Sequence, residues 1–139
     1  ADISRTMHCG PSKPTKRQKQ LYRLANEEIE HNLKLIRPGI SFFDIQDQAL
    51  KMPEEFHQNA YPCILHGVGM CDEYPNIIPR HRGRNTYDGT IEAGMVLCIE
   101  SYIGALGERD GVKLEQQVVV TEDGYEMMST YPLEESLLD

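Results

Sequence analysis

The stretch GVKLEQQVVVTEDG, residues 111–124, says most about the fold of this 139-residue chain. Valine and leucine dominate its first part and an Asp-Gly pair closes it, which is typical of a strand that runs into a hairpin turn. Glu115 lies inside the apolar run, where burying a carboxylate without a partner is costly. We therefore expect a strand; a single glutamate in such a strand usually points to solvent, and Glu115 becomes informative only together with other residues of this kind.

Other stretches have the same sequence pattern, an apolar run that contains one polar residue. GMVLCIESYIG, residues 94–104, predicts a second strand around Glu100, and LHGVGMCDEYPNI, residues 65–77, is strand-like as far as His66 and its glycine turn. The chain opens with ADISRT, in which Asp2 precedes an alternation typical of a strand. Because strands of one sheet lie side by side, they can direct such residues toward a common point.

The region before these strands has a helical pattern. PTKRQKQLYRLANEEIEHNLKLIRPG, residues 14–39, carries one apolar stripe, and Thr15 with Gln18 forms a capping box at its start. SFFDIQDQALKM, residues 41–52, predicts a second, shorter helix, whereas residues 76–90 have no clean period and are expected to form a long loop. Two helices followed by an antiparallel-looking sheet predict an α+β domain.

Composition excludes several classes of function. With 14 Lys and Arg against 22 Asp and Glu the net charge is −8, so we expect no nucleic-acid partner, because phosphate binding needs a clustered basic surface. No apolar run approaches the roughly 20 residues that span a membrane, and we expect no membrane partner. The cysteines show no CxxC spacing, which indicates a reduced, cytoplasmic protein. They are Cys9, Cys63, Cys71 and Cys98.

The polar residues embedded in the apolar runs favour a metal site. They are Asp2, His66, Glu100 and Glu115. Carboxylates with a single imidazole and no thiolate suit divalent ions such as Mn, Fe(II), Co or Zn. An acid-rich set of this kind can bridge two ions and so activate a water or polarise an oxygen.

Four motifs together resemble a known family. ADISRT, HGVGM followed by EYP, IEAGMVLCIES and GVKLEQQVVVTEDG are similar to the metal-binding half of the pita-bread fold. That family includes creatinase, the methionine aminopeptidases and the Xaa-Pro peptidases, or prolidases. The resemblance covers nearly the whole chain, in the family's order, and implies helices packed on a curved, largely antiparallel sheet.

The resemblance also implies a ligand set. In the peptidases two aspartates, a histidine and two glutamates hold two divalent ions. The second aspartate, the histidine and the two glutamates match Asp2, His66, Glu100 and Glu115. The first aspartate lies upstream in the family, so we expect residues 1–139 to be a single, partial catalytic domain that lacks its N-terminal part and is inactive alone. The sheet edge left open favours self-association, and we expect a homodimer.

One departure from the peptidase pattern points to a branch of the family. Prolidase-like members have a histidine after the glycine turn, where this chain has Asp72, and a carboxylate accepts a proton but donates none when ionised. Creatinase-type dimethylsulfoniopropionate lyases have an aspartate there, proposed as a catalytic base, and a pocket tyrosine that matches Tyr61. The ending STYPLEESLL, residues 129–138, also resembles that branch.

Three functions therefore remain open, all acting on or binding a small molecule. In a lyase, Asp72 would remove the proton beside the substrate carboxylate, dimethyl sulfide would leave, and acrylate would form, with Tyr61 facing the sulfonium. In an Xaa-Pro peptidase, metal-activated water would attack the peptide while Glu100 or Glu115 shuttles protons. In the third, the chain is a binding module without catalysis.

Overall fold

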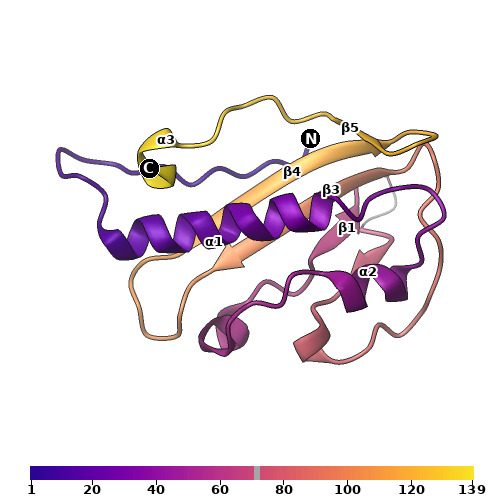
Figure 1. The fold of residues 1–139 in the computed structure, drawn as a ribbon, viewed down its shortest axis with the longest axis horizontal. Helices are drawn as coiled ribbons and strands as arrows, with labels where there is room; N and C mark the ends of the chain where they lie inside the picture. The colour runs from indigo at the N-terminus through magenta and orange to yellow at the C-terminus, as the bar shows by residue number, and fades with distance from the viewer. Residues whose placement is uncertain (71–72) are drawn as a thin grey trace.

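The computed structural model describes residues 1–70 and 73–139. Figure 1 shows a long helix lying across one face of a sheet, with the shorter helical segments at its margins. The elements, in chain order, are α1 Lys16–Leu33, α2 Phe42–Gln48, the 3-10 helix η1 Glu54–Asn59, β1 Leu65–Gly67, β2 Asn76–Ile77, the 3-10 helix η2 Arg80–Arg82, β3 Val96–Ile103, β4 Val112–Val120, β5 Tyr125–Met127 and α3 Glu135–Leu138.

The sheet has five antiparallel strands in the order β2-β1-β3-β4-β5. Its two long strands, β3 and β4, are the two that the apolar runs predict, and β5 completes the hairpin expected after the Asp-Gly pair. In the register, Glu100 of β3 lies opposite Glu115 of β4, and His66 of β1 lies opposite Cys98 of β3. Directly opposite residues point to the same face, so all of these face one side.

The N-terminal segment differs from the prediction, because residues 1–9 form no regular strand. It runs along β4 instead, as the indigo trace in Figure 1 shows, with a backbone bond from the Glu115 N–H to the Ser4 carbonyl at 3.1 Å. Side chains supply the remaining attachment. The Thr6 hydroxyl both donates to the Lys113 carbonyl and accepts from its N–H, each at 2.9 Å, and the Arg5 guanidinium donates to the Glu115 carbonyl at 2.6 Å.

The first helix follows its sequence closely. Thr15 and Gln18 form the expected capping box, and the apolar stripe is buried against β3 and β4. The second helix is shorter than the predicted range, since it ends at Gln48. The Leu50 N–H donates to the Asn32 side chain of α1 at 3.1 Å instead of continuing the helix. A tertiary contact therefore decides where α2 stops.

The region predicted as one long loop, residues 76–90, contains two short elements, β2 and η2. Asn85 organises it: its side chain accepts from the Ile78 N–H at 2.9 Å and donates to the Asn76 carbonyl at 3.2 Å. Among the helices of the described residues, none combines the length and apolar character needed to cross a membrane.

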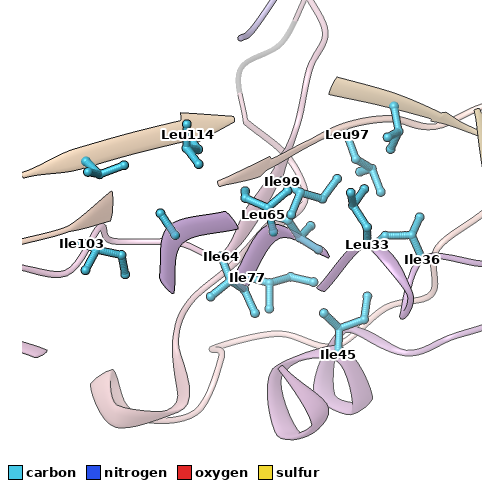
Figure 2. Close-up of a cluster of buried hydrophobic side chains, with 14 of the residues drawn as sticks. Leu33, Ile36, Ile45, Ile64, Leu65, Ile77, Leu97, Ile99, Ile103 and Leu114 are labelled. Carbon is cyan, nitrogen blue, oxygen red and sulfur yellow. The ribbon is translucent and has the colours of Figure 1, made fainter. Parts of the chain in front are cut away.

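The core lies between the helices and the sheet (Figure 2). Alternation along β3 directs Leu97, Ile99 and Ile103 into it, with Leu114 from β4 and Leu33 from α1. Each of these side chains is buried. Because successive strand residues point to opposite faces, the residues between them face away from α1, and that second face carries the polar cluster.

Candidate metal centre

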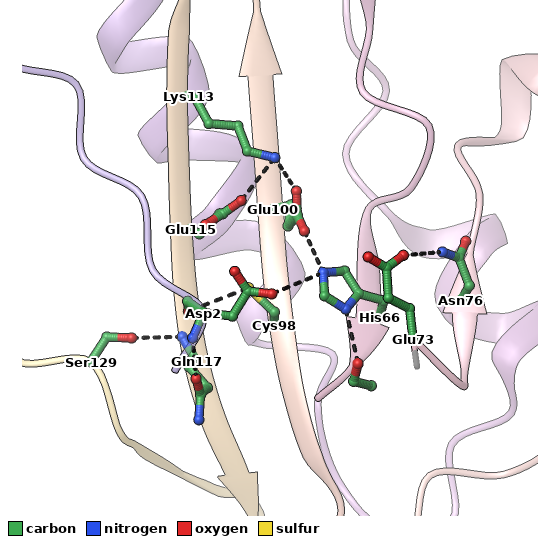
Figure 3. Close-up of polar contacts among 11 residues, drawn as sticks. Asp2, His66, Glu73, Asn76, Cys98, Glu100, Lys113, Glu115, Gln117 and Ser129 are labelled. Atoms are coloured by element: carbon green, nitrogen blue, oxygen red, sulfur yellow. Dashed lines mark hydrogen bonds and ion pairs between the residues drawn. The ribbon is translucent and has the colours of Figure 1, made fainter. Parts of the chain in front are cut away.

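The polar cluster forms where three strands and the N-terminal segment meet (Figure 3). β3 contributes Glu100, β4 contributes Glu115, β1 contributes His66, and the segment beside β4 brings Asp2. The position of Asp2 is fixed further by its own N–H, which donates to the Gln117 side-chain oxygen at 2.6 Å. Four segments distant in sequence thus direct side chains to one place.

The imidazole of His66 is held between a carbonyl and two carboxylates. Nδ1 donates to the Gly67 carbonyl at 2.9 Å, since a carbonyl oxygen only accepts. Nε2 lies 2.5 Å from Glu100 Oε1 and 3.4 Å from Asp2 Oδ2. The hydrogen bond to Glu100 raises the pKa of His66 to about 9, although burial acts against it. Because a carboxylate only accepts, Nε2 carries a proton in the metal-free protein. A metal ion would displace that proton, and the bond at Nδ1 favours the tautomer whose Nε2 then offers its lone pair.

A lysine completes the cluster. The ammonium of Lys113 contacts Glu100 Oε2 and lies 2.9 Å from Glu115 Oε1. It also stands 3.1 Å from the centre of the Tyr61 ring. Burial lowers the pKa of Lys113, but the hydrogen bonds to the two glutamates outweigh it and the net pKa is raised. For Glu100 burial raises the pKa, and the bonds from His66 and Lys113 outweigh it and lower the pKa.

The cluster has the donor set of a metal site. Asp2, His66, Cys98 and Glu100 each offer one candidate ligand atom, and these atoms lie within 4.8 Å of one another. Cys98 is the weakest candidate, because burial and then Asp2 raise its pKa and keep it a thiol. Its Sγ donates to the Asp2 carbonyl at 3.7 Å. The remaining atoms are carboxylate oxygens and an imidazole nitrogen.

These residues fit a divalent ion. Glu100 is 2% exposed and Glu115 is 6% exposed, so both carboxylates need positive charge close by. In the described residues that charge comes from the His66 imidazolium and the Lys113 ammonium. Oxygen-rich sets with one imidazole suit Mn, Fe(II), Co or Zn, and a divalent ion would supply the same charge.

The sequence-predicted site residues have different outcomes. Asp2, His66 and Glu100 lie together, and Glu115 joins them through Lys113, although Asp2 is not on a strand as expected. Whether these four bind metal stays a prediction. Tyr61 lies beside them and is half-buried; burial and then Glu100 raise its pKa. The predicted base, Asp72, lies outside the described residues.

The cluster has two members that the sequence did not predict, Lys113 and Cys98. Each stands two residues before a predicted glutamate, on the same face of the same strand. The period of two along a strand is therefore the signal that could have found them. A lysine in a strand normally faces solvent, so the residue type of Lys113 does not by itself point to the cluster.

Comparison with known proteins identifies the family and the fold of this chain. The model of metallopeptidase family M24 matches residues 1–122. The chain belongs to this family. Two solved relatives have the same fold: the X-Pro aminopeptidase of Thermotoga maritima, with 27% identity and a TM-score of 0.76, and an Xaa-Pro dipeptidase of Bacillus anthracis, with 25% identity and a TM-score of 0.77. They are matched over 95% and 96% of this chain, and each over 36% of its own length. The partial pita-bread fold of the α+β class is thereby confirmed.

Curated relatives include both enzyme classes. The dimethylsulfoniopropionate lyases DddP of Roseovarius nubinhibens and Roseobacter denitrificans are each 36% identical, over 138 and 140 residues. An uncharacterized peptidase of Staphylococcus epidermidis is 33% identical over 134 residues. The matches cover 99%, 99% and 94% of this chain, but only 31%, 31% and 36% of the relatives. The chain thus spans about a third of the length of these relatives.

Proposed function

We propose that this chain belongs to a divalent-metal enzyme that cleaves dimethylsulfoniopropionate to dimethyl sulfide and acrylate. Asp2, His66, Glu100 and Glu115 would hold two ions in the complete site, together with a fifth ligand from outside the chain. When bound, the ions would supply positive charge that holds the substrate carboxylate and acidifies the adjacent C–H bond.

The protein's own residues would carry the proton and orient the substrate. Asp72 would take the proton beside the carboxylate; the electrons of that bond form the carbon–carbon double bond, and the carbon–sulfur bond breaks with its pair on sulfur. Tyr61 would face the sulfonium and so direct the leaving group away from the carboxylate. The role of Asp72 rests on the sequence, as it lies outside the described residues.

The observation that carries the lyase proposal is that the Tyr61 ring already holds a cation beside Glu100. The Lys113 ammonium stands 3.1 Å from the ring centre, so the ring face accepts a positive charge next to the carboxylates. An aromatic face adjacent to a carboxylate-rich metal site suits a substrate that carries a sulfonium at one end and a carboxylate at the other. The α-ammonium of an Xaa-Pro dipeptide is a titratable cation two bonds from its reacting carbonyl, whereas the sulfonium is permanently charged and is itself part of the leaving group.

The second candidate is an Xaa-Pro dipeptidase or aminopeptidase. It is favoured by the solved relatives, which are named as X-Pro and Xaa-Pro peptidases. In that case Glu100 or Glu115 would move the proton from water to the leaving amine, and Asp72 would only replace a histidine. A binding module without catalysis is the third candidate, and the retention of ligand-competent residues at all four matching positions argues against it.

The proposal also covers the cellular compartment and the oligomeric state of the protein. Among the described residues Cys63 and Cys98 are buried free thiols, and burial raises the pKa of Cys63 to about 12. Unpaired buried thiols suit a reducing compartment, so we propose a cytoplasmic enzyme. We also propose that it acts as a homodimer, which light scattering of the purified protein tests.

The deciding experiment assays the complete protein on both substrates. Dimethyl sulfide is measured by gas chromatography and proline by amine detection, with the protein loaded in turn with Mn(II), Fe(II), Co(II) and Zn(II). Dimethyl sulfide without proline supports the lyase. Proline release from Xaa-Pro dipeptides without dimethyl sulfide would reject it in favour of the peptidase.

A further inference from the structure

We propose that Lys113 is an internal competitor for divalent cations. In the metal-free protein its ammonium takes the place between Glu100 and Glu115, and a divalent ion that binds these carboxylates displaces it. The inference rests on the metal centre of the proposed function, but not on which reaction that centre performs.

The register of the sheet explains why the lysine reaches this place. Glu100 and Glu115 lie opposite each other on β3 and β4, and Lys113 lies two residues before Glu115, opposite Tyr102. All of them face the same side of the sheet. Figure 3 shows the lysine side chain running toward the two carboxylates, with its ammonium bound to both.

The contacts of the ammonium are those a bound ion would make. One oxygen of each glutamate faces Nζ, Oε2 of Glu100 and Oε1 of Glu115, the latter at 2.9 Å. An ion shared by the two glutamates would use the same oxygens, so the ammonium and the ion cannot both occupy this position. The side chain of Lys113 is 23% exposed, whereas that of Glu100 is 1% exposed. The cation is therefore closer to solvent than the acid it neutralises.

Electrostatic repulsion between the two carboxylates favours a divalent ion over the ammonium. Two carboxylates directly opposite on neighbouring strands repel each other, and Glu100 has little water to screen it. One positive charge relieves this repulsion in the absence of metal, and a divalent ion relieves it more fully. Once the ion is bound, the ammonium becomes a like charge a few ångströms away and opposes it.

The lysine can leave without disturbing the sheet. Its backbone is fixed by Thr6, which bonds both its N–H and its carbonyl, so only the side chain needs to move. A lysine stem has four flexible methylenes and a well-hydrated ammonium, and such a group turns readily toward solvent. An arginine has a more weakly hydrated head group, and a shorter residue has fewer flexible methylenes.

The test compares metal binding by three forms of the complete protein, freed of metal with a chelator: wild type, Lys113→Met and Lys34→Met. Methionine keeps the apolar stem and removes the charge. Lys34 is exposed and makes no side-chain hydrogen bond or ion pair in the described residues, so its replacement is the matched loss of one positive charge. Calorimetry and the electron paramagnetic resonance signal of free Mn(II) give affinity and stoichiometry without any turnover.

We expect Lys113→Met to bind Mn(II) about tenfold tighter or more than wild type and Lys34→Met, because one opposing charge is gone. Its metal-free form should melt at a lower temperature, and Mn(II) should raise that temperature more than in wild type. Equal or weaker binding by Lys113→Met, or no binding by any form, would overturn the proposal. Lys113→Gln repeats the comparison if the methionine variant does not fold.

The same data separate this inference from the proposed function. In a Glu115→Gln background, Lys113→Met should bring a much smaller gain over Glu115→Gln alone if the competition takes place at the carboxylate pair. If the gain persists, the competition lies elsewhere and the inference fails, whatever the substrate. A protein that shows the competition but releases no dimethyl sulfide would retain the inference and lose the lyase.

Discussion

Ser101 of β3 donates a hydrogen bond of 2.6 Å to Glu28 of α1, on the face of the sheet opposite the polar cluster. Glu28 is 7% exposed, and Ser101 is the one hydrogen-bond partner of its side chain among the described residues. Burial raises the pKa of Glu28 to about 7, and the bond from Ser101 only partly offsets this. The chain thus holds a buried acid near half-protonation at neutral pH, outside the proposed active site.

Glu28→Gln should therefore stabilise the protein at pH 8 and leave it nearly unchanged at pH 4. The folded pKa of about 7 exceeds the ordinary value of 4.5, so the native state binds the proton more tightly than the unfolded state. Stability is present at low pH and is lost as the pH rises from about 4.5 through 7. The shift corresponds to roughly 3 kcal/mol in the free energy of unfolding.

Denaturant titrations at the two pH values measure this effect. Glu27→Gln is the matched control, because Glu27 is the exposed neighbour on the same helix. It should change stability little at either pH. The same pH dependence in wild type and Glu28→Gln would show that this carboxyl is ionised normally.

Gly67→Ala should destabilise the protein and disturb the histidine beside it. A Cβ at this position would lie 1.9 Å from the carbonyl oxygen of Tyr74, which is backbone and cannot turn away. We expect a loss of at least roughly 2 kcal/mol in the free energy of unfolding. Gly69→Ala is the control, since a Cβ there meets nothing within 4 Å. Urea unfolding compares the two variants, and equal stability would contradict the close approach.

His66→Ala should lower metal affinity far more than Cys98→Ser. Nε2 of His66 lies among the carboxylates, whereas Cys98 remains a thiol that donates to a backbone carbonyl. Loss of the imidazole should cost about a hundredfold or more in affinity for Mn(II), and a serine hydroxyl can keep the bond that the thiol makes. Metal content after dialysis, by mass spectrometry, checks this. A large loss in Cys98→Ser would make the sulfur a ligand.

Helices and strands that follow from the periodicity of apolar residues are predicted well, whereas features that depend on tertiary contacts are predicted poorly. β3, β4 and α1 are long and regular, and the pairing of Glu100 with Glu115 follows from two adjacent strands that each hold one acid. The N-terminal segment was mispredicted as a strand, because Arg5 and Thr6 attach it through side chains that no alternation reveals.

The place of Lys113 in the cluster also depends on a tertiary contact. The period of two places Lys113 on the same face as Glu115, but only the register of β3 against β4 brings its ammonium between the two glutamates. The end of α2 is a further case, since Asn32 of α1 takes the N–H of Leu50. Such contacts join residues far apart in sequence, and a local pattern does not contain them.

Asp72→Asn in the complete protein tests the proposed lyase chemistry. Asparagine keeps the shape of the side chain but does not accept a proton as a base does. Loss of a general base typically lowers the rate by about 10²–10⁴, so dimethyl sulfide release should nearly vanish while metal content stays close to normal. Asp123→Asn, in the exposed hairpin between β4 and β5, makes the same change of charge and should keep full activity. If Asp72→Asn keeps its rate, the base of the elimination is another group. If the wild-type protein releases proline instead, Asp72→His should raise that rate, because it restores the imidazole that prolidase-like relatives have at this position.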